Sequence, residues 1–172
     1  SVFYLLKLYI VKWNLQGLYE INKQEMTIAF TNGSEILCMG LDDPEKIKSI
    51  EGVTGIWIEE ATEFTLEDFT QLDLRLRGQS DSYKQIILSF NPISINSWIK
   101  AHFFDKQQVN SVILHTTYKD NRFLDAEYIR VLEGLDDPML HKIYALGEWG
   151  ELKGLIYTNW EVIDEWPDFV KQ

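Results

Sequence analysis

The spacing of hydrophobic residues changes several times along the chain, and each change predicts a different element. Residues 2–16 are apolar on nearly every side, which predicts a helix buried between neighbours. Apolar runs at residues 25–30 and 35–39 flank an Asn-Gly pair, the strongest short-range signal of a β-hairpin. Pro44 then suits the first position of a short helix that continues to residue 50.

Residues 53–58 and 85–90 form two apolar runs without polar alternation, which predict strands covered on both faces. Between these runs, Thr65 is followed three residues later by Asp68, the pattern of a helix capping box. A strand, a helix and a second strand in this order predict a parallel pair of strands.

The rest of the chain continues this alternation. The pattern predicts helices near residues 96–104, 125–134 and 138–146, a strand at 109–116 and a last strand at 155–163. The expected fold class is therefore α/β, with a mostly parallel sheet and flanking helices. The last strand begins after residue 150 and has the pattern of an entry to another domain.

Composition and charge narrow the class of protein. With 172 residues, 45% of them hydrophobic, the chain suits one folded domain and cannot be a disordered tail. A single cysteine, Cys38, excludes a disulfide framework and a Cys-based zinc site, and it suits a cytoplasmic protein. The apolar run at residues 2–11 is too short to span a membrane.

The net charge of −11 is spread unevenly, with two lysines against nine acidic residues in residues 41–70. Residues 71–130 carry eight basic and six acidic residues. An acidic chain binds nucleic acid poorly, so this second stretch is the only face expected to meet DNA. The alternative is that the acidic excess only keeps the surface soluble.

The most specific feature is the pair of glutamates, Glu59 and Glu60, that ends the first buried strand. Open α/β sheets bind ligands at the carboxyl edge of their strands. Adjacent residues of a strand point to opposite sides, so the two carboxylates are expected to do different work. One could meet Mg²⁺ or its water shell and the other an attacking water, as in a Walker B strand. Alternatively, both only solvate the strand end.

Polar and basic residues near this strand end are further candidates. Ser89 and Asn91 end the next buried strand and could sense a terminal phosphate, or they form an Asx turn that stops the strand. Arg75 and Arg77 lie at a helix end, where they either balance the helix dipole or contact a phosphate. Lys48 is a comparable candidate for a charge delivered between subunits.

Other chemistry-bearing residues give no site. The three histidines show no ligand spacing, and the six tryptophans are scattered, which favours core packing over a base-stacking platform. No Gly-x-x-x-x-Gly-Lys-Ser/Thr sequence occurs, so no loop of this chain is expected to hold nucleotide phosphates.

Taken together and in this order, six blocks resemble the large subunit of the tailed-phage terminase, of the type found in phages and prophages of Gram-positive bacteria. The blocks are residues 40–49, 56–64, 74–78, 88–92, 117–124 and 147–157. The resemblance implies a DNA-packaging motor, in which a P-loop ATPase of the additional-strand type drives translocation and a nuclease cuts the DNA. It also implies Mg²⁺ and ATP as cofactors of the intact protein, and neither is expected to bind tightly to this chain alone.

The resemblance assigns roles to the candidate residues. Glu59 is expected to be the Walker B acid that meets Mg²⁺ through water, Glu60 the catalytic glutamate, and Ser89 to Asn91 the motif that couples hydrolysis to movement. The implied partners are double-stranded phage DNA, the terminase small subunit, the portal and further copies of the subunit in a ring. The implied location is the cytoplasm of a bacterial host, and no membrane is expected as a partner.

The sequence departs from the family at both ends, because the Walker A strand and loop and the nuclease acids are absent. We expect residues 1–150 to be the C-terminal part of an ATPase domain and residues 151–172 the lead-in to an absent nuclease domain. The P-loop NTPase-like sheet is expected to be incomplete, and the chain alone is expected to have no catalytic activity. The alternative is a non-catalytic binding module that contacts the small subunit or the portal; a helicase is disfavoured because no helicase-type pattern follows Glu60.

Overall fold

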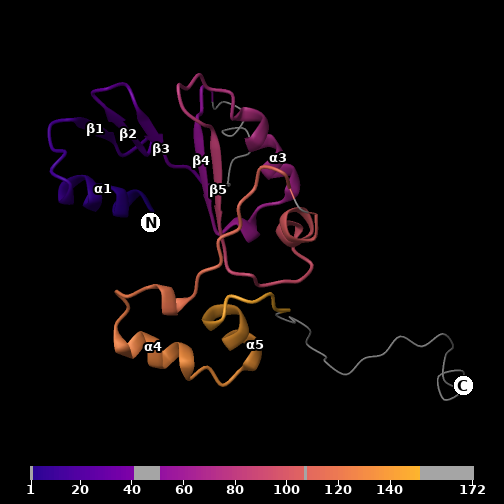
Figure 1. The fold of residues 1–172 in the computed structure, drawn as a ribbon. Coiled ribbons are helices and arrows are strands. Elements are labelled where there is room, and N and C mark those ends of the chain that lie inside the picture. The colour runs from indigo at the N-terminus through magenta and orange to yellow at the C-terminus, as the bar shows by residue number, and fades with distance from the viewer. Residues whose placement is uncertain (1, 41–50, 107, 152–172) are drawn as a thin grey trace, which may run out of the picture. The chain divides into compact units, whose positions relative to one another are not determined.

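The computed structural model describes residues 2–40, 51–106 and 108–151, and the chain divides into two compact units, residues 1–50 and 51–172 (Figure 1). The expected helix at residues 44–50 and the expected strand at 155–163 lie outside the described residues. None of the helices within the described ranges is long and apolar enough to cross a membrane.

The first unit packs one helix on a three-stranded antiparallel sheet of order β1-β2-β3. Its elements are α1 (Val2–Lys12), β1 (Tyr19–Asn22), β2 (Thr27–Phe30) and β3 (Glu35–Leu37). Phe3 and Ile10 of the helix and Ile28 of the sheet form the core. The predicted hairpin is confirmed as β2 and β3, whereas β1 was not predicted from the sequence.

The helix α1 is shorter and more exposed than its sequence predicts. Asn14 adopts a left-handed conformation, with φ at 57°, and ends the helix. The Leu15 N–H donates to the Ile10 carbonyl and the Asn14 N–H to the Val11 carbonyl, both at 3.1 Å, which is the Schellman pattern. Tyr4 remains 63% exposed, so the expectation of burial on every side is wrong for the described residues.

The second unit contains the predicted parallel pair of strands, β4 (Gly55–Glu59) and β5 (Gln85–Ser89), connected through α3 (Leu66–Arg75). The capping box that begins α3 is confirmed. Thr65 Oγ1 accepts from the Asp68 N–H at 3.1 Å, and Asp68 Oδ2 accepts from the Thr65 N–H at 2.9 Å. Ile58 of β4 and Leu72 of α3 are buried in this unit.

The predicted helix near residues 96–104 forms as a short helical turn that continues into the π-helix η2 (Lys100–Asp105). Aromatic side chains join it to α3. The ring of Phe69 lies 5.3 Å from that of Trp98 and 5.6 Å from that of Phe103, measured between centroids.

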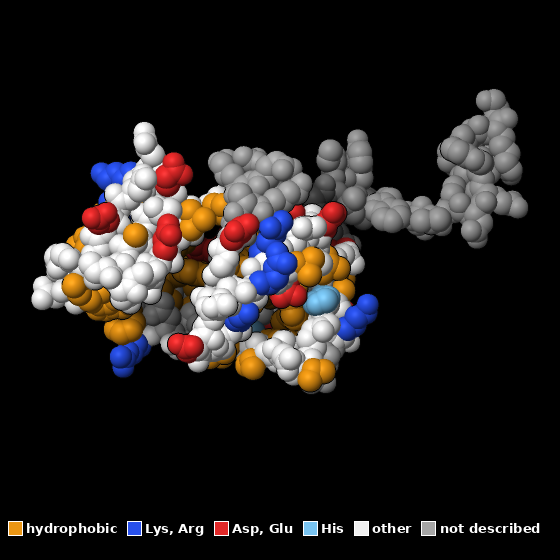
Figure 2. Space-filling view, turned by 90° about the horizontal axis from the view of Figure 1, so that it is seen from above, with side chains coloured by type: hydrophobic (Ala, Val, Ile, Leu, Met, Phe, Trp, Pro, Cys, Tyr) orange, Lys and Arg blue, Asp and Glu red, His pale blue; other side chains and the backbone are white. Residues whose placement is uncertain are grey.

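The strand predicted at residues 109–116 is not formed. Val109, Val112 and Leu114 are 98%, 96% and 84% exposed. A β-branched, apolar composition favours a strand only where a partner edge supplies hydrogen bonds and a covered face. No described strand pairs with this segment, and its apolar side chains are at the surface. Figure 2 shows hydrophobic side chains reaching the surface in several places.

The last part of the second unit is helical, as predicted. Its elements are the short turn η3 (Tyr118–Asp120), α4 (Ala126–Glu133), α5 (Pro138–Leu140) and the π-helical segment η4 (His141–Ala145). Asp125 caps α4 by accepting from the Tyr128 N–H at 2.7 Å. Asp137 caps α5 by accepting from the Met139 N–H, with Pro138 in the first turn. Each helix therefore begins where its own sequence supplies a cap.

Replacing Thr65 by Ala is expected to lower the free energy of unfolding by about 1 kcal/mol, because an N-cap hydroxyl is lost. The hydrogen bonds from Thr65 hold the pKa of Asp68 below its ordinary value. The stabilisation by the charged carboxylate is therefore present above the ordinary pKa and is lost as the pH falls through the lowered one. Urea unfolding of both proteins between pH 7 and pH 3 measures this. If the difference in unfolding free energy between the two proteins stayed constant from pH 7 to pH 3, the charged Asp68 carboxylate would not contribute to the cap.

Candidate functional site

Parallel pairing brings the two strand ends together. In the register of β4 and β5, Glu59 lies opposite Ser89. These are the last residues of their strands, so the predicted acidic residue and the predicted coupling residue share one edge of the sheet. The expectation that the carboxyl ends of both strands meet is therefore confirmed for this pair.

The two faces of this sheet differ in exposure. Ile58 is 3% exposed on one face, whereas Trp57 and its register partner Ile87 are 51% and 49% exposed on the other. The prediction that both strands are covered on both faces is therefore wrong for the described part of the chain. Since Glu59 lies two residues after Trp57, its side chain belongs to the exposed face.

Glu60 leaves the regular strand. Its backbone is left-handed, with φ at 51° and ψ at 49°, a conformation uncommon for a residue with a side chain. The short turn η1 (Ala61–Glu63) follows at once, and Ala61 is fully buried. Because the chain turns at Glu60, the two neighbouring glutamates stand in different backbone environments. Both side chains are solvent-exposed.

Ser89 is held by a side chain that the sequence did not single out. The indole N–H of Trp57 donates to Ser89 Oγ at 3.0 Å. Ser89 Oγ in turn lies 3.5 Å from the carbonyl oxygen of Ile58, at the long limit of a hydrogen bond. Trp57 was expected to serve core packing; instead it is half exposed and bonded to a candidate residue.

The chain after Ser89 is tied to a segment about sixty residues further along. The Gly150 N–H donates to the Pro92 carbonyl at 3.0 Å, and the Ile95 N–H donates to the Gly150 carbonyl at 2.8 Å. The rings of Phe90 and Trp149 lie 5.7 Å apart. The loop that contains Asn91 is therefore fixed from both sides by the segment around Gly150.

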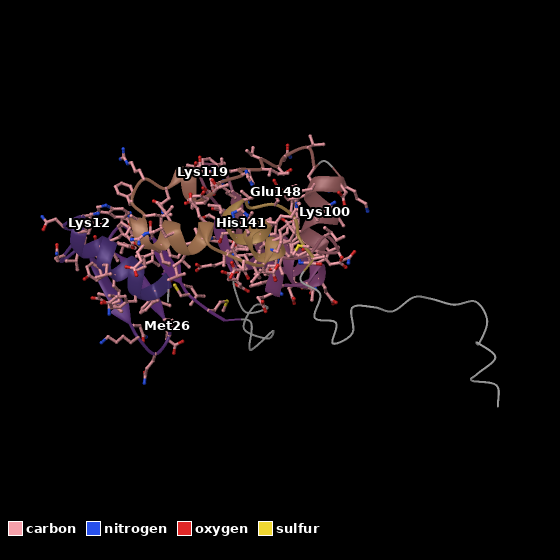
Figure 3. All side chains as sticks on the ribbon, turned by 90° about the horizontal axis from the view of Figure 1, so that it is seen from below. Lys12, Met26, Lys100, Lys119, His141 and Glu148 are labelled. Atoms are coloured by element: carbon pink, nitrogen blue, oxygen red, sulfur yellow. The ribbon has the colours of Figure 1, made fainter. Side chains whose placement is uncertain are left out.

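Gly150 itself has no room for a side chain. A Cβ atom there would lie 2.5 Å from Ile143 Cδ1 and Cγ1 and 3.0 Å from Met139 Sδ. Both neighbours belong to the helical segment α5 and η4, in which Figure 3 labels His141. The close approach anchors residues 147–151 on this helical segment.

The two arginines are not near the strand-end carboxylates. The Gly78 N–H, next to Arg77, donates to the Val53 carbonyl at 2.9 Å, just before β4 begins. At 3.3 Å per residue, Val53 lies about 20 Å along the chain from Glu59. A phosphate contact by Arg75 or Arg77 within the same subunit and at this edge is therefore unsupported. Their role toward a neighbouring subunit stays a prediction, and Lys48 lies outside the described residues.

The donor set at the strand end suits a hydrated cation better than a dehydrated one. In the described ranges, no three His, Cys, Asp or Glu side chains gather in a way that could hold a metal ion. Mg²⁺ commonly keeps several waters and takes only one or two carboxylates together with substrate phosphates. A single exposed carboxylate, Glu59, beside the Ser89 hydroxyl fits that pattern.

Sequence reasoning missed two features of this site. Trp57 could have been found from its place two residues before Glu59, on the same face of the strand. The contact of Gly150 with Pro92 left no local signal, because it depends on packing between segments distant in sequence.

The fold and this edge define an α/β protein with an acidic strand end beside a polar one, and comparisons with known proteins specify the family. Residues 1–148 match the family model described as "Phage terminase large subunit". The chain is 31% identical over 159 residues to the PBSX phage terminase large subunit of Bacillus subtilis, covering 80% of this chain and 36% of that protein. It is 31% identical over 144 residues to the terminase large subunit of Bacillus phage SPP1, covering 77% and 34%.

A solved structure shows the same fold. The large terminase from a thermophilic bacteriophage matches with a TM-score of 0.64 and 22% identity over 84% of this chain and 36% of that one. By the match of residues 1–148 to the family model and the identity to the two curated relatives, the chain belongs to the phage terminase large subunit family. It spans about a third of the length of the curated relatives it matches.

Replacing Gly150 by Ala is expected to destabilise the second unit by about 1–3 kcal/mol, because the added methyl group overpacks Ile143. The amide of Ile95 should then lose protection from hydrogen exchange. The matched control is Gly55→Ala, where a Cβ meets no atom within 4 Å. Equal exchange rates at Ile95 in both variants would show that the segment around Gly150 does not hold the loop.

Proposed function

We propose that this chain forms part of the ATP-hydrolysing and force-coupling region of a phage DNA-packaging motor. The observation that carries the proposal is the register of β4 and β5, which brings Glu59 beside Ser89 at one carboxyl edge. In P-loop NTPases an acidic residue at the end of such a strand holds Mg²⁺ beside the phosphates, and a polar residue on the neighbouring strand end is placed to meet a phosphate oxygen.

The residues take different parts in this proposal. Glu59 holds Mg²⁺ through its water shell, and Glu60, at the turn out of the strand, orients the attacking water. When bound, Mg²⁺ supplies positive charge that offsets the charge developing on the phosphate oxygens. Ser89 and Asn91 contact the terminal phosphate, so that its presence or loss changes the position of the loop that Gly150 holds.

In the described part of the chain, the lateral side of β5 that faces away from β4 is unpaired. This open side supports a P-loop NTPase-like architecture that a further strand completes. Within the described residues, β5 pairs only with β4, and residues 109–116 form no strand beside it. An unpaired edge leaves N–H and C=O groups available to another strand. We propose that the strand and loop of Walker A type, absent from this sequence, occupy that edge in the working motor.

The implied partners follow from the same proposal. Double-stranded phage DNA, the terminase small subunit, the portal and further copies of the large subunit are the partners of such a motor, acting in the host cytoplasm. Glu59 and Glu60 belong to the acidic stretch 41–70 and are unsuited to DNA. Contact with DNA is therefore assigned to residues 71–130.

A second candidate function rests on the exposed apolar segment at residues 109–114. Val109, Val112 and Leu114 are almost fully exposed, which is typical of a surface that meets a partner. In this alternative, the chain is a non-catalytic assembly module of the packaging machinery that contacts the small subunit or the portal.

The purified chain is expected to show no measurable ATP turnover, because no loop of its sequence can hold the β- and γ-phosphates. Steady-state phosphate release with Mg-ATP, compared with a protein-free blank, measures this. Isothermal titration with Mg-ATP is the companion measurement. Micromolar binding of Mg-ATP in this titration would contradict the proposal that this chain has no loop that holds the β- and γ-phosphates.

A chimera tests the roles of the two glutamates. When residues 1–151 replace the matching region of an ATP-hydrolysing large terminase subunit, Glu60→Gln is expected to lower turnover by about 100-fold or more. Nucleotide binding should remain, since only the water-orienting charge is lost. Glu59→Gln should instead raise the Mg²⁺ concentration needed for half-maximal turnover.

The control is Glu63→Gln, which removes an exposed carboxylate three residues away and should leave turnover unchanged. Near-normal turnover in the Glu60→Gln chimera would mean that the two acids have exchanged roles or that neither is catalytic. Failure of the unchanged chimera to bind nucleotide would point to the alternative, a binding module.

A further inference from the structure

We propose that Trp57 is a positioning residue for Ser89. By donating to Ser89 Oγ, Trp57 fixes this oxygen so that the serine hydroxyl can donate its own proton to an anionic oxygen bound next to Glu59. The proposal rests on the proposed function, because it deepens the part of Ser89 in that site. Trp57 belongs neither to the pair of glutamates nor to the coupling motif at Ser89 to Asn91.

The argument begins with the hydrogen-bonding capacity of the two groups. An indole N–H can only donate, whereas a serine hydroxyl has one proton to give and two lone pairs. The bond of 3.0 Å from Trp57 Nε1 therefore uses one lone pair of Ser89 Oγ. The oxygen is fixed in place, and the hydroxyl proton must find another acceptor.

The only acceptor of that proton within the described residues is a poor one. The Ile58 carbonyl oxygen lies 3.5 Å from Ser89 Oγ, at the long limit of a hydrogen bond. A proton held this weakly turns easily to a better acceptor, above all a charged one. Ser89 is therefore available as a donor, although its oxygen does not move.

The register shows where such an acceptor would come from. Trp57, Glu59 and Ser89 share the exposed face of the two strands, and Glu59 lies directly opposite Ser89. Neighbouring strands are about 4.8 Å apart, so the serine hydroxyl is within reach of an oxygen that interacts with the Glu59 carboxylate or its hydrated cation. A phosphate oxygen fits this description, because it is anionic and accepts hydrogen bonds.

Packing within the described residues does not explain the placement of Trp57. Its side chain is half exposed beside an equally exposed Ile87, although tryptophan usually buries most of its large apolar surface. The contact that distinguishes this indole is its bond to Ser89, so Trp57→Phe removes the donor while it keeps an aromatic ring on the sheet.

The experiment records the indole ¹⁵N–¹H resonances of the whole chain. Trp57→Phe identifies the Trp57 signal by its disappearance. Ser89→Ala is expected to move that signal toward the position of a free indole, and Ser89→Thr, which keeps the hydroxyl, should restore it. Trp98, whose indole donates to the Phe64 carbonyl, is the internal control for folding and should not shift. A Trp57 signal unchanged by Ser89→Ala, with the Trp98 signal in place, would overturn the proposal.

A Mn²⁺ titration, with Mn²⁺ standing for Mg²⁺, separates this proposal from the proposed function. Mn²⁺, held weakly without a nucleotide, is expected to broaden the Trp57 signal in the unchanged chain and in Ser89→Ala, and to broaden it much less in Glu59→Gln. If Ser89→Ala shifts the signal and Mn²⁺ has no effect, the positioning by Trp57 stands and the cation site at Glu59 fails. If Mn²⁺ broadens the signal and Ser89→Ala does not shift it, the cation site stands and the positioning by Trp57 is wrong.

Discussion

The parallel pairing of β4 and β5 is the constraint on which the candidate site depends. A slip of one residue would place Ser89 opposite Ile58 and turn each side chain of β5 to the other face of the sheet. The buried face opposes such a slip, because Ile58 would lose its apolar surroundings. The burial of one face thus fixes the chemistry that the other face presents to solvent.

The second requirement is that the loop after β5 be held. Its two backbone hydrogen bonds to Gly150 would not fix a loop by themselves, since each contributes about 1 kcal/mol. They are supported by the aromatic contact of Phe90 with Trp149 and by the close approach of Gly150 to Ile143. The loop after β5 and residues 147–151, where the described part of this unit ends, are therefore joined by several kinds of contact.

The sequence alone determined the elements whose signals are local. The Asn-Gly hairpin, the capping box at Thr65 and the helix starts near residues 125 and 138 all formed where predicted, because each depends on residues within four positions of one another. The order of blocks around Glu59 and Ser89 was likewise enough to identify the family, which the comparisons confirm.

Tertiary structure decided whatever depends on a partner distant in the sequence. Residues 109–116 have the propensity of a strand but form none, because a strand is stable only when its backbone groups and at least one face are covered. The bond of Trp57 to Ser89 spans 32 residues, and the contact of Gly150 with Pro92 spans more. Neither leaves a periodic pattern, because a hydrogen bond between distant segments is set by the register and packing of the elements that carry its ends.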